Sequence, residues 1–203
     1  MDRRSQQSAM VRLGNALLDI SALPGRYGSI LILVLVLVVM VSVVGAQMGL
    51  SDLFVWDRRV PLFGNHLNMT SIVELQWHLF SLLIMLSGAY ALRNDRHIRV
   101  DVLSARFTSR TRLWVDLFGD IFLLIPFFAL LAWYSLAFTQ MAYGFGEQSN
   151  AGGLVDRYLV KAVLPLGSVL LVVAGVGRVL RNIGLLLTNK GGDAPSSSEG
   201  SIS

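Results

Sequence analysis

The sequence predicts an all-α, polytopic membrane protein with four transmembrane helices, an N-terminal interfacial amphipathic helix and both termini in the cytoplasm. Three observations lead to this prediction. Only 15% of the 203 residues are charged and 54% are hydrophobic, whereas soluble domains carry roughly 25% charged residues. The apolar residues gather in four long uncharged runs, as expected of helices that cross about 30 Å of hydrocarbon. The basic residues lie beside these runs, mainly on one side of the predicted membrane.

The composition also excludes several classes of function. The chain has no cysteine, which rules out disulfide scaffolds, thiol nucleophiles and cysteine metal sites. The formal net charge of +4 does not indicate nucleic-acid binding, because the basic residues flank apolar runs and do not line one groove.

Residues 1–26 form a cytoplasmic arm that contains an amphipathic helix at residues 9–20. Its apolar residues recur at spacings of three and four, with Arg12 and Asp19 on the polar side. These apolar residues are Met10, Leu13, Leu17 and Ile20. The helix is too short and too polar to span, so we expect it in the inner membrane interface. The alternative is a soluble helix that packs on the protein itself.

The transmembrane domain is predicted to cover residues 27–188. Its spans lie at about residues 28–49, 71–92, 115–143 and 158–181. The first run also has features of a cleaved signal peptide, but its length and the long segment before it favour a membrane anchor. Pro126 and Pro165 should kink the third and fourth spans.

The distribution of Lys and Arg predicts the orientation. Thirteen of the 17 basic residues lie in the N-terminal arm, the loop after the second span or the C-terminal segment, and four lie in the remaining two loops. By the positive-inside rule, the termini and the middle loop face the cytoplasm, which requires an even number of crossings. Residues 189–203 are rich in Gly and Ser and are predicted to form a disordered cytoplasmic tail.

A group of polar residues opens the second span. Glu74, His78 and Ser81 share one helical face near the outer boundary, beside Trp77. One interpretation is a proton or cation relay. The other, which the shallow position favours, is a hydrogen-bonded pair that docks on a neighbouring helix, with Trp77 as an interface anchor.

Two carboxylates, Asp116 and Asp120, lie at the cytoplasmic end of the third span beside a loop with six arginines. We expect ion pairs that hold this loop against the helix. A paired-carboxylate acid–base site is the less well supported alternative. In the fourth span, small residues predict a face for close helix packing. They are Gly167, Ser168, Ala174 and Gly175.

The three histidines do not fall at similar depths. His66 precedes the second span, His78 lies just inside it and His97 is in the middle loop, so bis-histidine haem ligation is not expected. Zinc ligation is also poorly supported. We therefore expect no catalytic, substrate-binding or metal-binding residue and no cofactor in this chain.

Two segments together resemble the small, DctQ-type membrane subunit of tripartite ATP-independent periplasmic (TRAP) transporters. Residues 74–103 resemble the second helix and following loop of that family, where a Glu and a His-Ile-Arg-Val-Asp segment recur, here Glu74 and residues 97–101. Residues 145–182 are similar to the third loop and fourth helix. The matching elements are Glu147/Ser149, Gly153/Leu154, Lys161/Ala162 and Pro165/Leu166/Gly167. The resemblance covers about residues 27–185. It departs at Asp156-Arg157, where a more apolar or aromatic stretch is expected.

The resemblance implies a scaffold subunit, not an enzyme, in the bacterial inner membrane. Its partners are a large membrane subunit, a periplasmic substrate-binding protein and the lipid bilayer. The complex performs sodium-coupled, binding-protein-dependent uptake of an organic acid, such as a dicarboxylate or sialic acid, and sodium binds in the large subunit. The alternatives are a self-contained small proton-coupled transporter and a haem-bearing membrane anchor subunit.

Three sets of residues then acquire expected roles. The set for subunit contact or helix knitting comprises Glu74, Trp77, His78, Ser81, Gly167, Ser168, Ala174 and Gly175. The set that orders the cytoplasmic loop comprises Arg93, His97, Arg99, Asp101, Asp116 and Asp120. The periplasmic docking surface comprises Glu147, Ser149 and Asp156.

Overall fold

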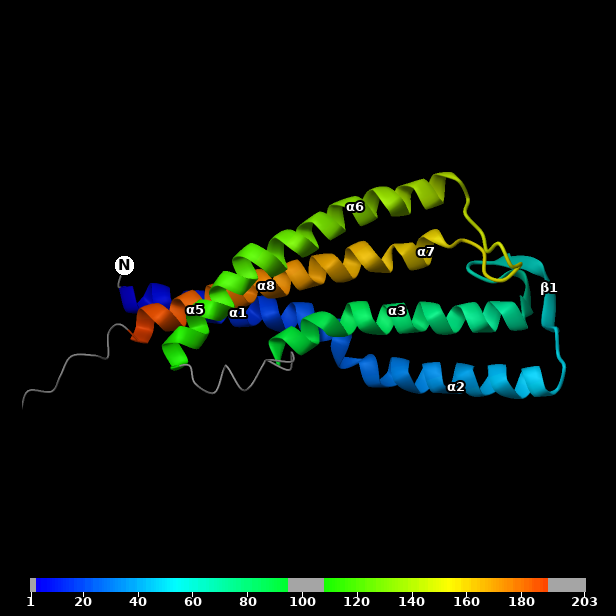
Figure 1. The fold of residues 1–203 in the computed structure, drawn as a ribbon, viewed down its shortest axis with the longest axis horizontal. Helices are drawn as coiled ribbons and strands as arrows, with labels where there is room; N and C mark the ends of the chain where they lie inside the picture. The colour runs from blue at the N-terminus through cyan, green and yellow to red at the C-terminus, as the bar shows by residue number, and fades with distance from the viewer. Residues whose placement is uncertain (1–2, 95–107, 190–203) are drawn as a thin grey trace, which may run out of the picture.

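The computed structural model describes residues 3–94 and 108–189 (Figure 1). The helices are α1 (Arg3–Arg26), α2 (Gly28–Gln47), α3 (Met69–Arg93), α5 (Ser109–Gly119), α6 (Ile125–Gly144), α7 (Tyr158–Lys161) and α8 (Val163–Asn189), and the π-helical turn η1 (Asp120–Leu124) joins α5 to α6. The strands are β1 (Asp52–Val60) and β2 (Gly64–Asn68). The predicted disordered tail beyond Asn189, and the loop residues His97, Arg99 and Asp101, lie outside the described residues.

Four helical stretches are long and apolar enough to cross a membrane, which confirms that part of the predicted fold. They are Ala9–Gln47, Met69–Arg93, Arg110–Gly144 and Tyr158–Leu187. The beginning of α1 and the end of α8 lie at one end of the molecule, and the β-strands and the loop after α6 lie at the other (Figure 1). The end with β1 and β2 is called the hairpin end below.

The loop after α2 corrects the all-α prediction, because it forms a two-stranded antiparallel ribbon. Val55 pairs with His66, and Val60 pairs with Gly64 across a tight turn. Gly64 has a φ of +66°, which a glycine adopts without strain. The Trp56 indole N–H donates to the Gly64 carbonyl over 2.8 Å and fixes the turn.

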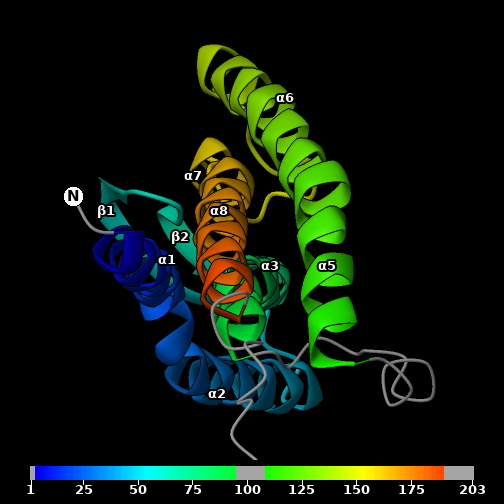
Figure 2. The same cartoon turned by 90° about the vertical axis from the view of Figure 1, so that its left-hand side faces the viewer.

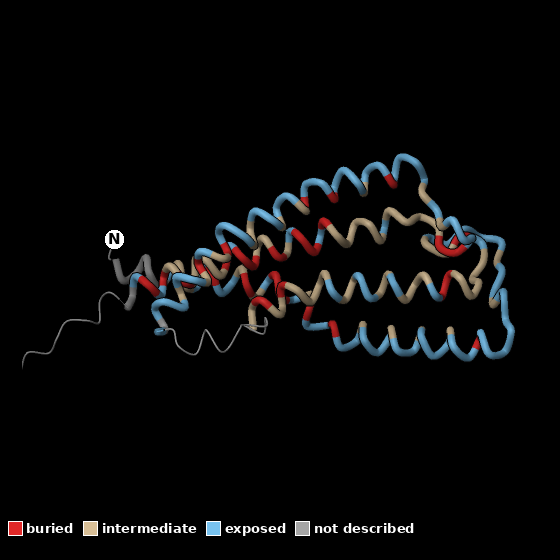
Figure 3. Tube along the Cα trace, in the orientation of Figure 1, coloured by how far each residue is buried: buried red, intermediate tan, exposed pale blue. Residues whose placement is uncertain are grey.

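Helix α8 is the centre of the bundle. Viewed end-on, it is surrounded by α1, α3 and the α5–α6 helix (Figure 2). The core cluster comprises Leu18, Ala89, Leu92, Leu171 and Ala174. Buried residues are concentrated along α1 and α8, whereas α2 is almost entirely exposed (Figure 3).

Helix α1 packs through a face that the sequence analysis did not select. A Cβ atom on Gly14 would lie 2.6 Å from the Gly177 carbonyl oxygen, and one on Gly177 would lie 2.9 Å from that of Gly14. The two backbones therefore touch. Leu13 and Ile20, from the predicted apolar stripe, are 55% and 60% exposed. Leu17, from the same stripe, lies against α8, since a Cβ atom on Gly177 would be 3.0 Å from its Cβ atom. The helix therefore packs on the protein, as one alternative proposed, and leaves only part of the stripe on its outer side.

Pro126 and Pro165, the two prolines for which kinks were predicted, interrupt regular helix geometry. In η1, just before Pro126, the Ile125 N–H bonds to the Asp120 carbonyl in the wider π-helical turn. Such a turn makes room for a ring that clashes with the carbonyl four residues earlier in an α-helix. Pro165 cannot donate to the Lys161 carbonyl, and the helix is broken at Ala162, between α7 and α8.

Candidate functional site

A polar cluster at the hairpin end, called here the outer cluster, fastens the loop after α6 to the start of α3. The Glu74 carboxylate accepts hydrogen bonds from the Ser149 hydroxyl and, over 2.9 Å, from the Leu154 N–H. A Cβ atom on Gly153 would lie 2.6 Å from the Glu74 Oε2 atom, so a side chain there would displace the carboxylate from this position. Asn68 caps α3 and donates from Nδ2 to the Gly152 carbonyl over 2.8 Å.

The other predicted residues of the second span point elsewhere. His78 does not contact the Glu74 carboxylate; its Nδ1 atom bonds the Glu74 backbone carbonyl one turn earlier. Trp77 is 69% exposed, and Ser81 is also exposed. The structure therefore brings Glu74 to the loop and not to its helix neighbours.

The three residues predicted for periplasmic docking all have partners within the chain. Ser149 bonds Glu74, as described above. Glu147 forms an ion pair with Lys161 of α7, whose ammonium lies 3.8 Å from the centroid of the Phe138 ring. Asp156, in the left-handed region at a φ of +52°, pairs with Arg59 of β1 over 2.9 Å. Their role in docking stays a prediction.

The other end of the bundle holds a buried ion pair. Asp120 is fully buried, and Arg178 of α8 grips both of its oxygens, with Nε donating to Oδ2 over 2.6 Å and Nη2 bonding Oδ1. This pair corrects the sequence-based expectation, which placed the partner of Asp120 among the arginines of the preceding loop. Asp120 is the first residue of the π-helical turn η1.

Further polar groups lie in the same half of the bundle. Arg93, at the end of α3, pairs with Asp19 of α1 and so ties the arm to the bundle. Asp116 is half-buried one turn before Asp120. Asn182 of α8 is 1% exposed, and neither atom of its amide has a hydrogen-bond partner within the described residues.

The predicted small residues of α8 serve two different neighbours. A Cβ atom on Gly167 would lie 2.6 Å from the Met85 Cβ of α3, and one on Gly175 would lie 2.6 Å from a methyl of Leu124 in η1. Ala174 and Ser168 are fully buried. These residues knit the helices of one chain and are not available to a second one.

Sequence reasoning missed several residues that complete these contacts. Asn68 could have been found, because an Asn directly before a helix is a common N-cap. The Gly14–Gly177 contact and the pairing of Arg59 with Asp156 had no local signal, because each joins segments far apart in the sequence. Within the described parts of the chain, no group of three or more His, Asp or Glu side chains is arranged to hold a metal ion.

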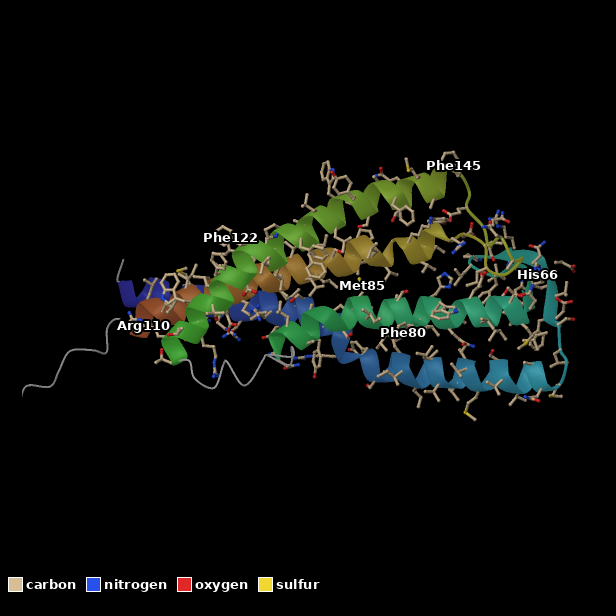
Figure 4. The ribbon with its side chains drawn as sticks, in the orientation of Figure 1. His66, Phe80, Met85, Arg110, Phe122 and Phe145 are labelled. Atoms are coloured by element: carbon tan, nitrogen blue, oxygen red, sulfur yellow. The ribbon has the colours of Figure 1, made fainter. Side chains whose placement is uncertain are left out.

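Aromatic side chains cover the outer side of α5–α6. Phe122 and Phe145 project away from the bundle (Figure 4) and are 62% and 84% exposed. Groups of this kind are suited to lipid or to an apolar protein surface. Polar groups thus hold the chain together at both ends, while its flanks remain apolar.

Comparison with protein families identifies a match. The family model described as "Tripartite ATP-independent periplasmic transporters, DctQ component" matches residues 35–184. The matched region runs from α2 to α8 and contains both the outer cluster and the Asp120–Arg178 pair. Comparison with curated proteins and with solved structures found no match.

Proposed function

The chain belongs to the DctQ family, the small membrane subunits of tripartite ATP-independent periplasmic transporters, and from this premise we propose that it is the structural scaffold of such a transporter. It supports a large membrane subunit in the bacterial inner membrane. That subunit carries out sodium-coupled uptake of an organic acid, such as a dicarboxylate or sialic acid, which a periplasmic binding protein delivers. Substrate and sodium bind in the large subunit, and this chain needs no cofactor.

The observation that carries the proposal is the use of charged groups inside the bundle. Ionisable groups within a membrane-embedded bundle commonly mark the pathway of a solute. Here the Glu74 carboxylate is engaged by Ser149 and Leu154, and Asp120 is held by Arg178. These groups fasten one helix or loop to another, which is the task of a scaffold.

The apolar flanks supply the surface that a scaffold needs. Helix α2 packs mainly on α3. Only 6% of the residues in its most apolar 18-residue stretch are buried. The outer side of α6 exposes Phe127, Leu130, Trp133 and Tyr134 by at least 60%. In the complex, these faces meet lipid and the large subunit.

The proposed orientation places the hairpin end in the periplasm and α1 at the cytoplasmic interface, with its exposed Leu13 and Ile20 against the membrane. The hairpin and the loop after α6 then form one platform for the binding protein. Further contacts besides the outer cluster hold this platform: Arg59 pairs with Asp156, and the Val155 N–H donates to the Leu62 carbonyl over 2.9 Å.

Single cysteines test this orientation, because the natural chain has none. Asn65→Cys in β2 and Asn15→Cys in α1 both replace exposed residues. In intact cells with a permeable outer membrane, an impermeant maleimide should label Asn65→Cys, and Asn15→Cys only after the inner membrane is opened. Labelling of both sites before opening would contradict the orientation.

Co-purification tests the scaffold role. The tagged chain is expressed with the large membrane subunit of its own transporter and extracted in mild detergent. The expected result is a stable complex of the two proteins. Recovery of the tagged chain alone, while the large subunit remains folded and active in uptake without it, would contradict the proposal.

A further inference from the structure

A groove runs along the outer half of the bundle between α3, α6 and α7–α8. Its volume is about 310 Å³, and it is open to one side. Polar and apolar residues are separated along its length. His78, Ser81, Arg157 and Lys161 line the end near the hairpin, and residues farther along the same helices, including Met85 and Leu164, line the deeper part. Figure 4 shows Met85 between α3 and α8.

This separation of polar from apolar residues along the groove follows from the direction of the helices. Both α3 and α7–α8 start at the hairpin end and run inwards (Figure 1), so the first groove residues of each are the outermost. Ile84 and Phe138 complete the apolar walls. A ligand that fits has a polar group at the membrane surface and a hydrocarbon part directed along the helices.

The charges at the outer end favour an anionic group. Lys161 is occupied by Glu147 and the Phe138 ring, and Asp156 is occupied by Arg59. Glu74 faces the loop. The half-buried Arg157 guanidinium has no hydrogen-bond or ion-pair partner among the described residues.

The geometry of the arginine side chain agrees with the choice of an anionic group. A guanidinium binds a phosphate through two parallel N–H···O bonds, a geometry that matches the planar Arg side chain.

We propose that this groove is a phospholipid site, in which the lipid phosphate lies on Arg157 and one acyl chain lies between Ile84, Met85 and Leu164. The bound lipid fills the space where α6 diverges from α7–α8. It therefore belongs to the wall of the bundle and is distinct from lipids that merely surround the protein. This site goes beyond the scaffold role and does not depend on it.

The test compares two lipids that differ only in the phosphate-bearing headgroup. The full-length chain is purified in detergent, stripped of lipid and titrated with phosphatidylglycerol or with diacylglycerol of the same acyl chains. Bound lipid is counted by native mass spectrometry. We expect phosphatidylglycerol to bind about tenfold more tightly, because charge-assisted bonds to phosphate are the strong ones. Equal binding of the two lipids would overturn the proposal.

Variants locate the site. Arg157→Gln should reduce the preference for phosphatidylglycerol to about twofold or less, and Arg157→Lys should keep part of it, because the charge remains while the paired geometry is lost. Arg58→Gln, in the exposed part of β1, is the matched control and should bind like the natural chain. Retained preference in Arg157→Gln, or an equal loss in Arg58→Gln, would overturn the assignment.

Two further measurements separate a lipid from other occupants. Ile84→Trp fills the apolar part of the groove and should weaken both lipids while Arg157 remains in place. Full phosphatidylglycerol binding by this variant would contradict the proposed position of the acyl chain. Glycerol phosphate should bind far more weakly than the lipid; binding of equal strength would indicate a free-phosphate site and overturn the proposal.

Discussion

Helices α2 and α8 are both long and apolar, yet they occupy opposite positions in the molecule. Of the residues in the most apolar 18-residue stretch of each helix, 33% are buried in α8 and 6% are buried in α2. Helix α8 contains small residues at its contacts with α1, α3 and η1, whereas α2 consists mostly of Val, Leu and Ile. Apolar content places both helices in the membrane, and small and polar residues select the one that becomes the centre.

The physical reason lies in the solvent. Lipid tails contact a large aliphatic side chain as well as another helix does, so hydrophobicity alone does not bring membrane helices together. Membrane helices are held together by close approach of their backbones and by buried polar bonds. Gly177, which lets α1 touch α8, and Arg178, which grips Asp120, are neighbours on α8.

The largest effect should come from breaking the ion pair at the centre. Arg178→Met leaves the buried Asp120 carboxylate without its partner, and we expect a loss of about 3–5 kcal/mol in the free energy of unfolding. Thermal unfolding in detergent measures it. Arg12→Met, on the exposed side of α1, is the control. The double variant Asp120→Leu/Arg178→Met should recover most of the loss, and failure to do so would mean that the two charges are not coupled.

The next effect separates close packing in α8 from loose packing in α2. Gly177→Ala places a methyl against the backbone of Gly14, which cannot yield, and should cost about 1–3 kcal/mol. Gly45→Ala in α2 meets only the end of the flexible Met69 side chain and should change stability little. Thermal unfolding of the two variants side by side provides the comparison, and equal costs would contradict it.

Loss of one bond in the outer cluster should have a smaller and more local effect. Glu74→Gln replaces a carboxylate that accepts from Ser149 and Leu154, and its amide NH₂ opposes one of these donors. We expect a cost of about 0.5–1.5 kcal/mol, seen as faster hydrogen exchange at the Leu154 N–H. Unchanged exchange there would show that Glu74 does not hold the loop.

Substitution on the outer face of α2 should have the smallest effect. Val36 is 51% exposed, and Val36→Leu keeps the surface apolar, so the isolated chain should change by less than about 0.5 kcal/mol. A loss of several kcal/mol in the isolated chain would mean that α2 is packed as α8 is. A loss confined to the complex with the large subunit would assign this face to the subunit contact.

The sequence was sufficient for the membrane-crossing helices but not for their packing. Uncharged runs of adequate length indicated the four long helices, because span length is a one-dimensional property. The packed face of α1 was not predicted correctly. Periodicity selected the stripe with Leu13 and Ile20, yet these residues lie outside and Gly14 lies inside. In a membrane protein, the most apolar face of a helix need not be the packed one.

In the candidate site, too, the sequence indicated individual residues but not how they pack together. Glu74, Ser149, Gly153 and Leu154 were all singled out through the family resemblance, but nothing in the sequence indicated that they meet. Likewise, Asp120 was recognised as needing a partner, and its nearest cations along the chain were the wrong choice. The partner, Arg178, is 58 residues away, and only the fold brings it near.

Solute movement in proteoliposomes tests the scaffold claim most directly. The chain is reconstituted alone, and with the large subunit and the binding protein, and labelled organic acid uptake is followed under an inward sodium gradient. The account predicts that the chain alone moves no more solute than protein-free liposomes, whereas the complete system accumulates it. Sustained uptake by the chain alone would contradict the account.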